Sequence, residues 1–328
     1  MPPYPLLPAA PKQAGPELFT VEDSGTSALM KAKSVWSPAQ GDTSRSGHYT
    51  DAKAVTNKKW GKVVVAARTT IKPHVVVIDH ATRKTLWHEK DKALQDLSGG
   101  VHSATALPDG NVVVHAPCSQ APTKDNLALV RAADPGKVIP YDFKDSHASV
   151  WIDAGDGHGG GHLWAVGRTG HAKDKTGKCV LREYSYQSGD HPSLTQVAQY
   201  DLVAKPLELT YLKQTGRWES PHDVARHDRD TVWISTESRV VAFDLATRTV
   251  GAAPPARSVF QSAHEQGDPL TSATNLKSLN IHDGTIMYTQ SMGDETDAKT
   301  VSVVKDGKKH TLDLGPVYKA RWAWPAGH

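Results

Sequence analysis

Three histidines stand at the same place in three similar segments of the chain. The segments are Val101-His102-Ser103-Ala104, Ser146-His147-Ala148-Ser149 and Pro221-His222-Asp223-Val224. In each, the histidine opens a run that can form a strand, and a turn and a clear apolar strand follow. Because repeats of one fold place equivalent positions around one axis, we expect the three imidazoles to converge on a central pocket.

Imidazole offers two kinds of chemistry at such a position. It can accept a proton near neutral pH, or it can bind a metal ion. We therefore consider two alternatives: a pocket that needs no cofactor, and a divalent ion, calcium or manganese, held in the central channel by His102, His147 and His222.

Further polar residues fall near the beginnings of the repeated strands or in the loops that lead into them. Cations outnumber carboxylates among these residues, which favours an anionic ligand. The candidates for substrate binding are Arg45, Lys53, His147, Trp218, His222, Lys277 and Arg321, and the candidates for catalysis are His48, Tyr49 and His102.

A structural interpretation stands beside the chemical one. The chain has 17 histidines, so most of them must lie at the surface or serve structure. Polar side chains on inner strands can also join neighbouring blades by hydrogen bonds alone.

The repeats themselves predict an all-β fold. The strand and turn of residues 75–83 resemble those of residues 239–248, and Lys277-Ser278-Leu279-Asn280-Ile281 begins a further copy. No long segment shows a helical period. We expect a single β-propeller of six or seven four-stranded blades; the count from the repeats is six, and residues 251–275 could hold strands of a seventh.

The two ends of the chain predict how the ring closes. Residues 1–16 contain six prolines and are expected to form an extended tail, with the propeller over residues 17–328. Strands are expected at 18–21, 28–31 and 34–36, and the last strand, 318–324, has no blade after it. Together they would make one blade and remove the open edges.

Composition limits the partners. The net charge of +3 and the lack of a dense Lys/Arg tract predict no nucleic-acid partner, and no apolar run approaches a membrane span. We expect a monomer. Cys118 and Cys179 could pair or both remain reduced. The missing secretory signal is weak evidence against export.

The motifs together resemble a known group. Asp23-Ser24-Gly25-Thr26, Val35-Trp36-Ser37-Pro38, Asp51-Ala52-Lys53, His102-Ser103-Ala104 and Pro221-His222-Asp223-Val224 are similar to those of secreted β-propellers that include rhamnose–glucuronate lyases and related α-L-rhamnosidases. The resemblance covers most of residues 18–325. It implies seven blades, secretion, and an acidic plant polysaccharide or oligosaccharide as substrate, such as the arabinogalactan of gum arabic.

The resemblance also implies a mechanism. The group relies on a histidine, and by position His48 is the first candidate and His102 the second. The expected reaction is exo-acting β-elimination at a terminal rhamnosyl-α-1,4-glucuronate linkage, with Tyr49 protonating the leaving oxygen and Arg45, Lys53, Lys277 or Arg321 neutralising the uronate carboxylate.

Three alternatives remain open at this point. An α-L-rhamnosidase acting on the same linkage would need two facing carboxylates; Asp51, Glu219, Asp223 and Glu265 are available, but nothing in the sequence pairs them. A non-catalytic propeller could bind a glycan or a protein. A metal-dependent lactonase would need more carboxylates and amides near the axis.

Overall fold

The computed structural model describes the chain in segments. These are residues 4–9, 18–22, 31–36, 49–69, 74–89, 94, 100–117, 126–153, 161–170, 177–202, 211–212, 217–237, 240–252, 276–282, 284–291, 298, 300–305, 308–314 and 317–322. Every regular element in these segments is a β-strand, which confirms the all-β class. No helix long and apolar enough to cross a membrane is found in this part of the chain.

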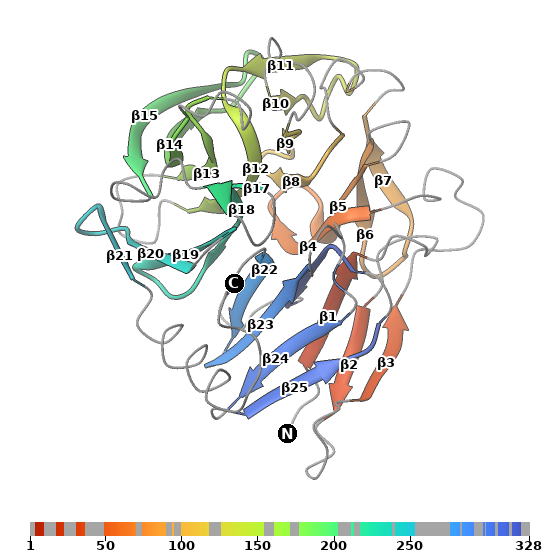
Figure 1. The fold of residues 1–328 in the computed structure, drawn as a ribbon. Helices are drawn as coiled ribbons and strands as arrows, with labels where there is room; N and C mark the ends of the chain where they lie inside the picture. The colour runs from red at the N-terminus through yellow and green to blue at the C-terminus, as the bar shows by residue number, and fades with distance from the viewer. Residues whose placement is uncertain are drawn as a thin grey trace.

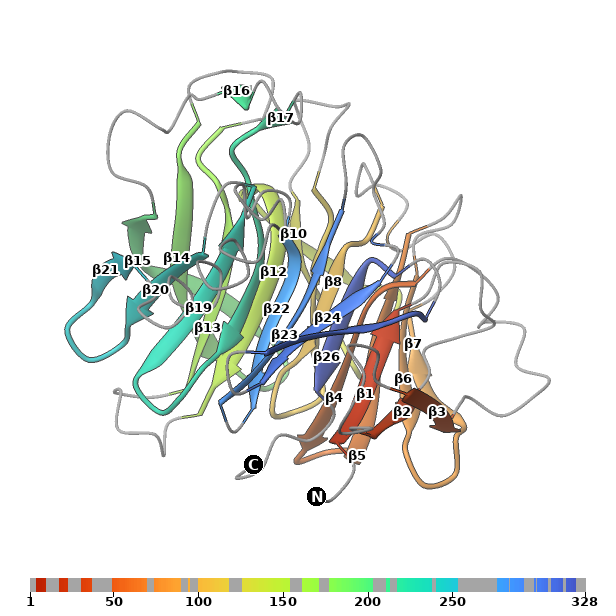
Figure 2. The ribbon, with the colours of Figure 1, turned by 60° about the horizontal axis from the view of Figure 1, so that its bottom comes forward.

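Five four-stranded blades are each built from one continuous stretch of chain, in a propeller arrangement (Figures 1 and 2). Within each, the strands pair antiparallel in sequence order. The blades are β4 (Tyr49–Asn57), β5 (Gly61–Arg68), β6 (His74–Asp79) and β7 (Thr85–His88); β8 (Ser103–Ala106), β9 (Val112–His115), β10 (Leu127–Val130) and β11 (Val138–Tyr141); β12 (Lys144–Ile152), β13 (His162–Arg168), β14 (Cys179–Gln187) and β15 (Ser193–Asp201); β18 (Pro221–Arg226), β19 (Thr231–Thr236), β20 (Val240–Asp244) and β21 (Thr249–Ala252); and β22 (Leu276–His282), β23 (Thr285–Gln290), β24 (Val301–Lys305) and β25 (Lys308–Leu312).

A further four-stranded sheet combines the two ends of the chain. Its order is β26 (Lys319–Trp322), β1 (Tyr4–Ala9), β2 (Leu18–Glu22) and β3 (Lys31–Trp36). Strand β1 pairs antiparallel with β26, with Leu6 opposite Trp322, and with β2 on its other side. A short hairpin of β16 (Tyr211–Leu212) and β17 (Arg217–Trp218) stands apart from these sheets.

The terminal sheet corrects the expected boundaries. The last strand pairs with residues 4–9 rather than with the strand that begins at Leu18, so the segment expected to be a proline-rich tail contains a strand of the propeller. Proline cannot donate to a β-ladder and is rare within central strands, so the six prolines among residues 1–16 hid this strand, which lies between β26 and β2. The two short strands expected at 28–31 and 34–36 are one strand, β3.

The five continuous blades are fewer than the six or seven blades that the sequence predicted. The expected site of a seventh blade, residues 251–275, begins with the last two residues of β21, and residues 253–275 lie outside the described residues.

Turn chemistry explains why the repeats look alike. The backbone N–H of Thr82 donates to the carboxylate of Asp79, and that of Thr247 donates to Asp244. In both turns the arginine that follows has a positive φ, 62° at Arg83 and 59° at Arg248. The two Asp-x-Ala-Thr-Arg sequences therefore form the same turn between the third and fourth strands of their blades.

The first strand of each blade lines the centre of the molecule. Strand β4 lies beside β8, β8 beside β12, β12 beside β18, and β18 beside β22; β26 contacts both β22 and β4. The apolar core lies between the blades. One cluster joins Val63 and Val65 of β5 to Val112 and Val114 of β9, all buried. Buried apolar side chains thus fix the inner strands that carry the polar residues of the centre.

Candidate functional site

Three of the inner strands share an irregularity at their beginnings. Register shifts interrupt the pairing of β4 between Tyr49 and Asp51, of β18 between Pro221 and Asp223, and of β22 between Leu276 and Ser278. A bulge of this kind places one extra residue on the strand and redirects its side chain. The residues at or equivalent to this position are Thr50, His102, His147, His222, Lys277 and Tyr318.

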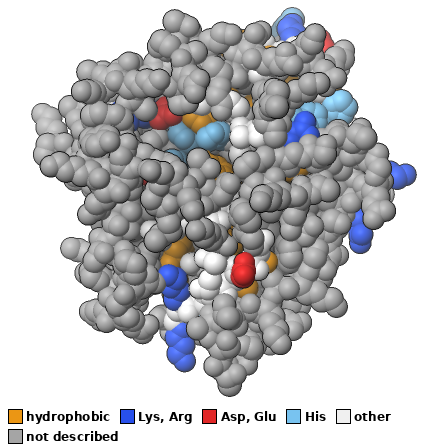
Figure 3. Space-filling view, turned by 45° about the vertical axis from the view of Figure 1, so that its right-hand side comes forward, with side chains coloured by type: hydrophobic (Ala, Val, Ile, Leu, Met, Phe, Trp, Pro, Cys, Tyr) orange, Lys and Arg blue, Asp and Glu red, His pale blue; other side chains and the backbone are white. Residues whose placement is uncertain are grey.

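Five of these side chains form a contiguous group, which we name the mouth row: His102, His147, His222, Lys277 and Tyr318. The ring centroids of His102 and His147 are 5.4 Å apart, and those of His147 and His222 are 5.0 Å apart. The structure therefore brings the three predicted histidines together. Figure 3 shows histidine side chains, in pale blue, beside a carboxylate and hydrophobic groups, surrounded by atoms that are not described.

The electrostatics of the mouth row favour neutral imidazoles. Burial lowers the pKa of His102 well below its ordinary 6.5, and the neighbouring His147, Lys319 and Lys277 lower it further. Burial also lowers the pKa of His147, against the opposing effect of Asp145. Both rings are thus uncharged at neutral pH, the form in which an imidazole can accept a proton.

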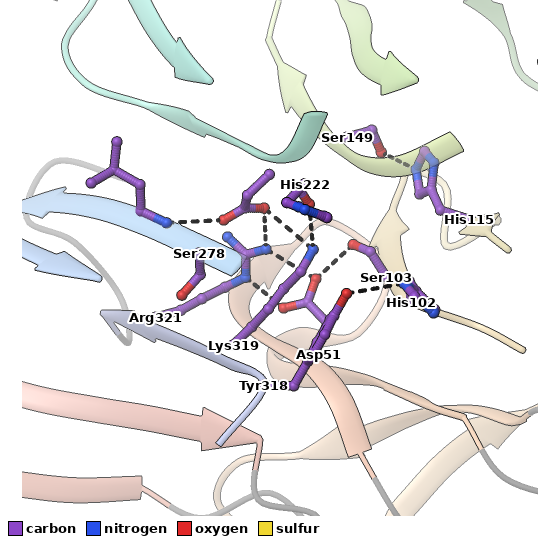
Figure 4. A network of polar contacts seen from close by, with 12 residues as sticks. Asp51, His102, Ser103, His115, Ser149, His222, Ser278, Tyr318, Lys319 and Arg321 are labelled. Carbon is purple, nitrogen blue, oxygen red and sulfur yellow. Dashed lines mark hydrogen bonds and ion pairs between the residues drawn. The ribbon is translucent and has the colours of Figure 1, made fainter. Parts of the chain in front are cut away.

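Tyr318 and His102 form a hydrogen-bonded pair. The phenol Oη lies 3.2 Å from His102 Nδ1, and the two ring centroids are 5.4 Å apart in an edge-on arrangement. Figure 4 shows this contact between the strands β26 and β8. When Nδ1–H donates to the phenol oxygen, Nε2 keeps its lone pair and can accept a proton.

The other end of the row is charged. His222 Nε2 lies 2.7 Å from Glu237 Oε1 and 3.0 Å from Lys277 Nζ, and the ammonium is 3.7 Å from the same carboxylate oxygen. All three side chains are buried. The carboxylate can only accept and so requires Nε2–H, whereas the ammonium can only donate and so requires the Nε2 lone pair. One ring nitrogen cannot satisfy both neighbours at once.

A second set of charged side chains lies beside the mouth row, one or more positions further along the inner strands. We name it the axial cluster: Asp51, Lys53, Asp223, Lys319 and Arg321. Arg321 binds Asp51 through Nε at 2.6 Å and Nη2 at 3.0 Å, and its Nη2 also binds Asp223 at 2.7 Å. Arg321 thereby joins three inner strands, β4, β18 and β26, in a contact that Figure 4 shows from close by.

The remaining members of the axial cluster are equally well bound. Lys319 Nζ donates to the His222 carbonyl oxygen at 2.9 Å and lies 3.6 Å from Asp223. Lys53 Nζ donates to Thr105 Oγ1 at 2.7 Å and to the Ser149 carbonyl oxygen at 2.9 Å. Each cation therefore has a fixed internal partner.

Charge neighbours set the protonation of the axial cluster. Burial alone would raise the pKa of Asp51, but Arg321, Lys319 and Lys53 together hold it below its ordinary value. Burial would lower the pKa of Arg321, but Asp223 and Asp51 raise it. Lys53 behaves differently: burial lowers its pKa to about 7 despite the nearby Asp51.

A fully buried histidine connects the axial cluster to the next blade. His115 Nδ1 and Nε2 each lie 2.7 Å from a serine hydroxyl, those of Ser146 and Ser149. Ser149 Oγ donates in turn to Thr105, the partner of Lys53. With both nitrogens engaged by neighbouring strands, His115 serves to join blades, the structural role considered for inner-strand polar groups.

Several predicted site residues lie elsewhere. His48 and Arg45 are outside the described residues, and the described part of Trp218 is its backbone in β17. Tyr49 is fully buried in an apolar cluster with Val64, Ala66, Val76 and Ile78. Tyr49 precedes the bulge of β4, and its ring lies in the apolar cluster rather than at the repeated position of the three histidines.

Lys53 and Arg321 were expected to bind substrate, but both are engaged in the axial cluster. The region was also expected to be poor in carboxylates; Asp51, Asp223 and Glu237 lie among its cations. The sequence interpretation missed Tyr318 and Glu237. Tyr318 could have been found as the sixth member of the repeated position, since it precedes the last inner strand as His102 precedes β8.

The cysteines leave the pairing question open. Cys179 is buried, and its thiol donates to the Glu219 carbonyl oxygen at 3.4 Å. Cys118 lies outside the described residues.

The three histidines do not form a metal-binding group. Within the described segments, no three His, Cys, Asp or Glu side chains are placed so that they could hold a metal ion. The donor set explains this: His222 Nε2 faces the ammonium of Lys277 at 3.0 Å, and His147 Nδ1 lies 2.8 Å from the Asp145 carbonyl oxygen. A cation next to a ligand nitrogen opposes a second cation.

The comparisons with known proteins assign no family to the chain. No family model matches the sequence, and no curated protein matches it. Among solved structures, the chain is similar to a protein of unknown function from Bacteroides caccae, with 12% sequence identity and a TM-score of 0.49, over 96% of this chain and 93% of that one.

Proposed function

We propose that the protein is a polysaccharide lyase that cleaves a terminal rhamnosyl-α-1,4-glucuronate linkage of plant arabinogalactan by β-elimination. The observation that carries the proposal is the contact between His102 Nδ1 and Tyr318 Oη at 3.2 Å, beside neutral imidazoles and Lys277. An imidazole and a phenol in contact provide a proton acceptor and a proton donor for a single elimination.

The two groups can complete a proton cycle. His102 Nε2 takes the proton from C5 of the uronate, and the C5 electron pair forms the C4–C5 double bond as the C4–O4 bond breaks. Tyr318 gives its proton to the leaving oxygen. The phenolate then takes a proton from water, and the imidazolium releases its Nε2 proton to water, so Tyr318 and the Nδ1–H form of His102 are both restored. This replaces the pair of His48 and Tyr49 expected from the sequence.

The positive end of the row supplies the electrostatic part. The C5 proton is weakly acidic until the charge that develops on the uronate carboxylate is stabilised. Lys277 is the cation of the mouth row, and it lies 3.0 Å from His222, whose ring adjoins that of His147. We assign the uronate carboxylate to this end and the reacting carbon to the His102 end.

The carboxylates near the axis favour elimination over hydrolysis. A rhamnosidase needs one carboxylic acid and one carboxylate that face the scissile bond. Asp51 and Asp223 are both bound by Arg321, and Lys319 is near Asp223, so neither is placed to exchange protons with a substrate.

The proposal has consequences for assembly and location. We infer that the terminal sheet of β26 and β1–β3 acts as a sixth blade and closes the ring, which is supported by the contacts of β26 with both β22 and β4. A closed ring leaves no inner edge to pair with another chain, which favours a monomer. Arabinogalactan is an extracellular polymer, so the proposed activity requires secretion.

The activity can be tested directly. Purified protein is incubated with gum arabic and other acidic plant glycans, and release of rhamnose and the ultraviolet absorbance of the new C4–C5 double bond are followed. We expect both signals, and we expect His102→Ala to lower kcat by about 10²–10⁴. His115→Gln is the matched control, because it alters a buried imidazole outside the row. Binding without product would indicate the non-catalytic alternative, and rhamnose without the double bond would indicate a hydrolase.

A further inference from the structure

The carboxylate of Glu237 has two partners at unequal distances. His222 Nε2 is 2.7 Å from Oε1, a strong hydrogen bond, whereas Lys277 Nζ is 3.7 Å from the same oxygen, beyond hydrogen-bond distance. Glu237 directly follows β19, and the two partners come from the inner strands β18 and β22. The contact between His222 and Glu237 can therefore persist while Lys277 exchanges Glu237 for another carboxylate.

We infer that Glu237 is a specificity-determining residue. In the free protein its carboxylate balances the charge of Lys277, and in the complex the carboxylate of an acidic sugar takes over this role. This rests on the assignment of the uronate carboxylate to the Lys277 end of the mouth row. On binding, Lys277 exchanges Glu237 for the ligand carboxylate, while His222 stays bound to Glu237. The chemical class of ligand is a uronate.

The exchange explains discrimination against neutral sugars. A hydroxyl group cannot replace a carboxylate beside a buried ammonium, because most of the electrostatic stabilisation would be lost. A uronate replaces one carboxylate with another and leaves the charge of the site balanced. Selectivity for acidic sugars therefore arises from the competing internal carboxylate as well as from the attraction of the cation.

The other charges around this end are fixed by contacts of their own. Lys319 donates to the His222 carbonyl oxygen and lies 3.6 Å from Asp223, and Asp223 is held by Arg321. His147, on the neighbouring strand, is a neutral ring whose pKa burial lowers. In this neighbourhood, the loose contact of Lys277 with Glu237 is the ionic contact that a ligand can exchange.

The inference predicts that removing the internal carboxylate strengthens uronate binding. D-glucuronate and D-glucose are titrated into wild-type protein, Glu237→Gln and Lys277→Met by calorimetry. We expect Glu237→Gln to lower the Kd for glucuronate about tenfold or more while glucose binding stays weak, and Lys277→Met to abolish glucuronate binding. A residue with a purely structural role would weaken binding when it is replaced.

The matched control is Glu89→Gln. Glu89 is buried and holds His74 through a 2.6 Å contact, in the blade of β4–β7 and outside the mouth row. Its replacement should leave glucuronate affinity unchanged. An unchanged or weaker affinity in Glu237→Gln, or equal binding of glucose and glucuronate by the wild type, would overturn the inference.

A second measurement uses the wild-type protein and does not depend on the stability of the variant. Proton and ¹⁵N NMR of labelled histidine follows the Nε2–H signal of His222 during titration with glucuronate. We expect this signal to remain hydrogen-bonded at saturation; its loss would mean that the ligand displaces Glu237 from His222 and would contradict the exchange. Neither measurement requires turnover, so a protein that binds glucuronate in this way but forms no double bond would refute the lyase proposal alone.

Discussion

The mouth row and the axial cluster are adjacent, buried and rich in ionisable groups, yet they are organised in opposite ways. In the axial cluster each charge meets a complementary partner, as Arg321 does with Asp51 and Asp223. In the mouth row the demands on the polar atoms conflict, since His222 Nε2 faces both Glu237 and Lys277. The charges of the axial cluster are therefore matched by their partners, whereas in the mouth row two partners compete for one nitrogen atom.

The difference separates charged groups that stabilise the fold from groups that can take part in binding or catalysis. A saturated buried network gains little from a ligand, since any new contact must break an internal one. In the mouth row, two imidazoles with lowered pKa values, a phenol and an ammonium 3.7 Å from its carboxylate can exchange protons and partners. The sequence interpretation assigned cations from both sets to substrate binding, and the proposed function keeps Lys277 in that role.

The largest expected effect comes from breaking the saturated set. Arg321→Met leaves Asp51 and Asp223 buried without their shared cation and should lower the free energy of unfolding by about 3–5 kcal/mol. Urea denaturation of the wild type and the variant measures this difference in the free energy of unfolding. Lys178→Met is the control: its pair with Asp201, 2.6 Å apart, is exposed and should contribute under about 1 kcal/mol. Equal losses in the two variants would show that the axial cluster does not stabilise the fold.

The contrast also shows which features of the centre could be predicted from the sequence. The repeats predicted the strands, the four-stranded blades and the adjacency of His102, His147 and His222, because one position in each repeat faces the centre. They could not show which carboxylate or imidazole each cation contacts. Whether Arg321 meets Asp51 depends on contacts between strands 270 residues apart, which no local pattern records.

Three other differences have simple physical causes. The strand at residues 4–9 is rich in proline and does not resemble an inner-blade strand, so its pairing with β26 was not predicted. Tyr49 precedes a bulge, and a shift of one position sends a side chain to the opposite face of the strand. Glu237 lies just beyond β19, outside the repeated position that the three histidines share.

The next effect is the contribution of Lys53 to the pH dependence of stability. Its pKa falls from the ordinary 10.5 in the unfolded chain to about 7 in the fold. Between these values the unfolded state binds more protons, so the free energy of unfolding should rise with pH, by up to about 1.4 kcal/mol per pH unit. Below about pH 7 this contribution is constant and unfavourable.

Lys53→Met isolates this contribution. Lys319 also has a pKa lowered by burial, and it adds a slope of the same sign, so the quantity to compare is the difference between wild type and variant. Urea midpoints at several pH values from 7 to 10 should show a steeper rise for the wild type. Parallel curves would mean that Lys53 stays charged in the fold, which its hydrogen bonds to Thr105 and Ser149 would then have to support.

Tyr318→Phe should have the smallest effect on stability but a large effect on turnover. Tyr318→Phe removes one hydroxyl from the mouth row and its 3.2 Å contact with His102, and should lower the free energy of unfolding by only about 0.5–1.5 kcal/mol. If the phenol protonates the leaving oxygen, kcat should fall by about 10²–10⁴.

Tyr141→Phe is the matched control, because the hydroxyl of Tyr141 accepts the backbone N–H of Leu194 at 2.8 Å in another part of the propeller. Tyr141→Phe should lose similar stability and keep its turnover. Equal activity in the two variants would place Tyr318 with the structural groups and remove the distinction between the mouth row and the axial cluster.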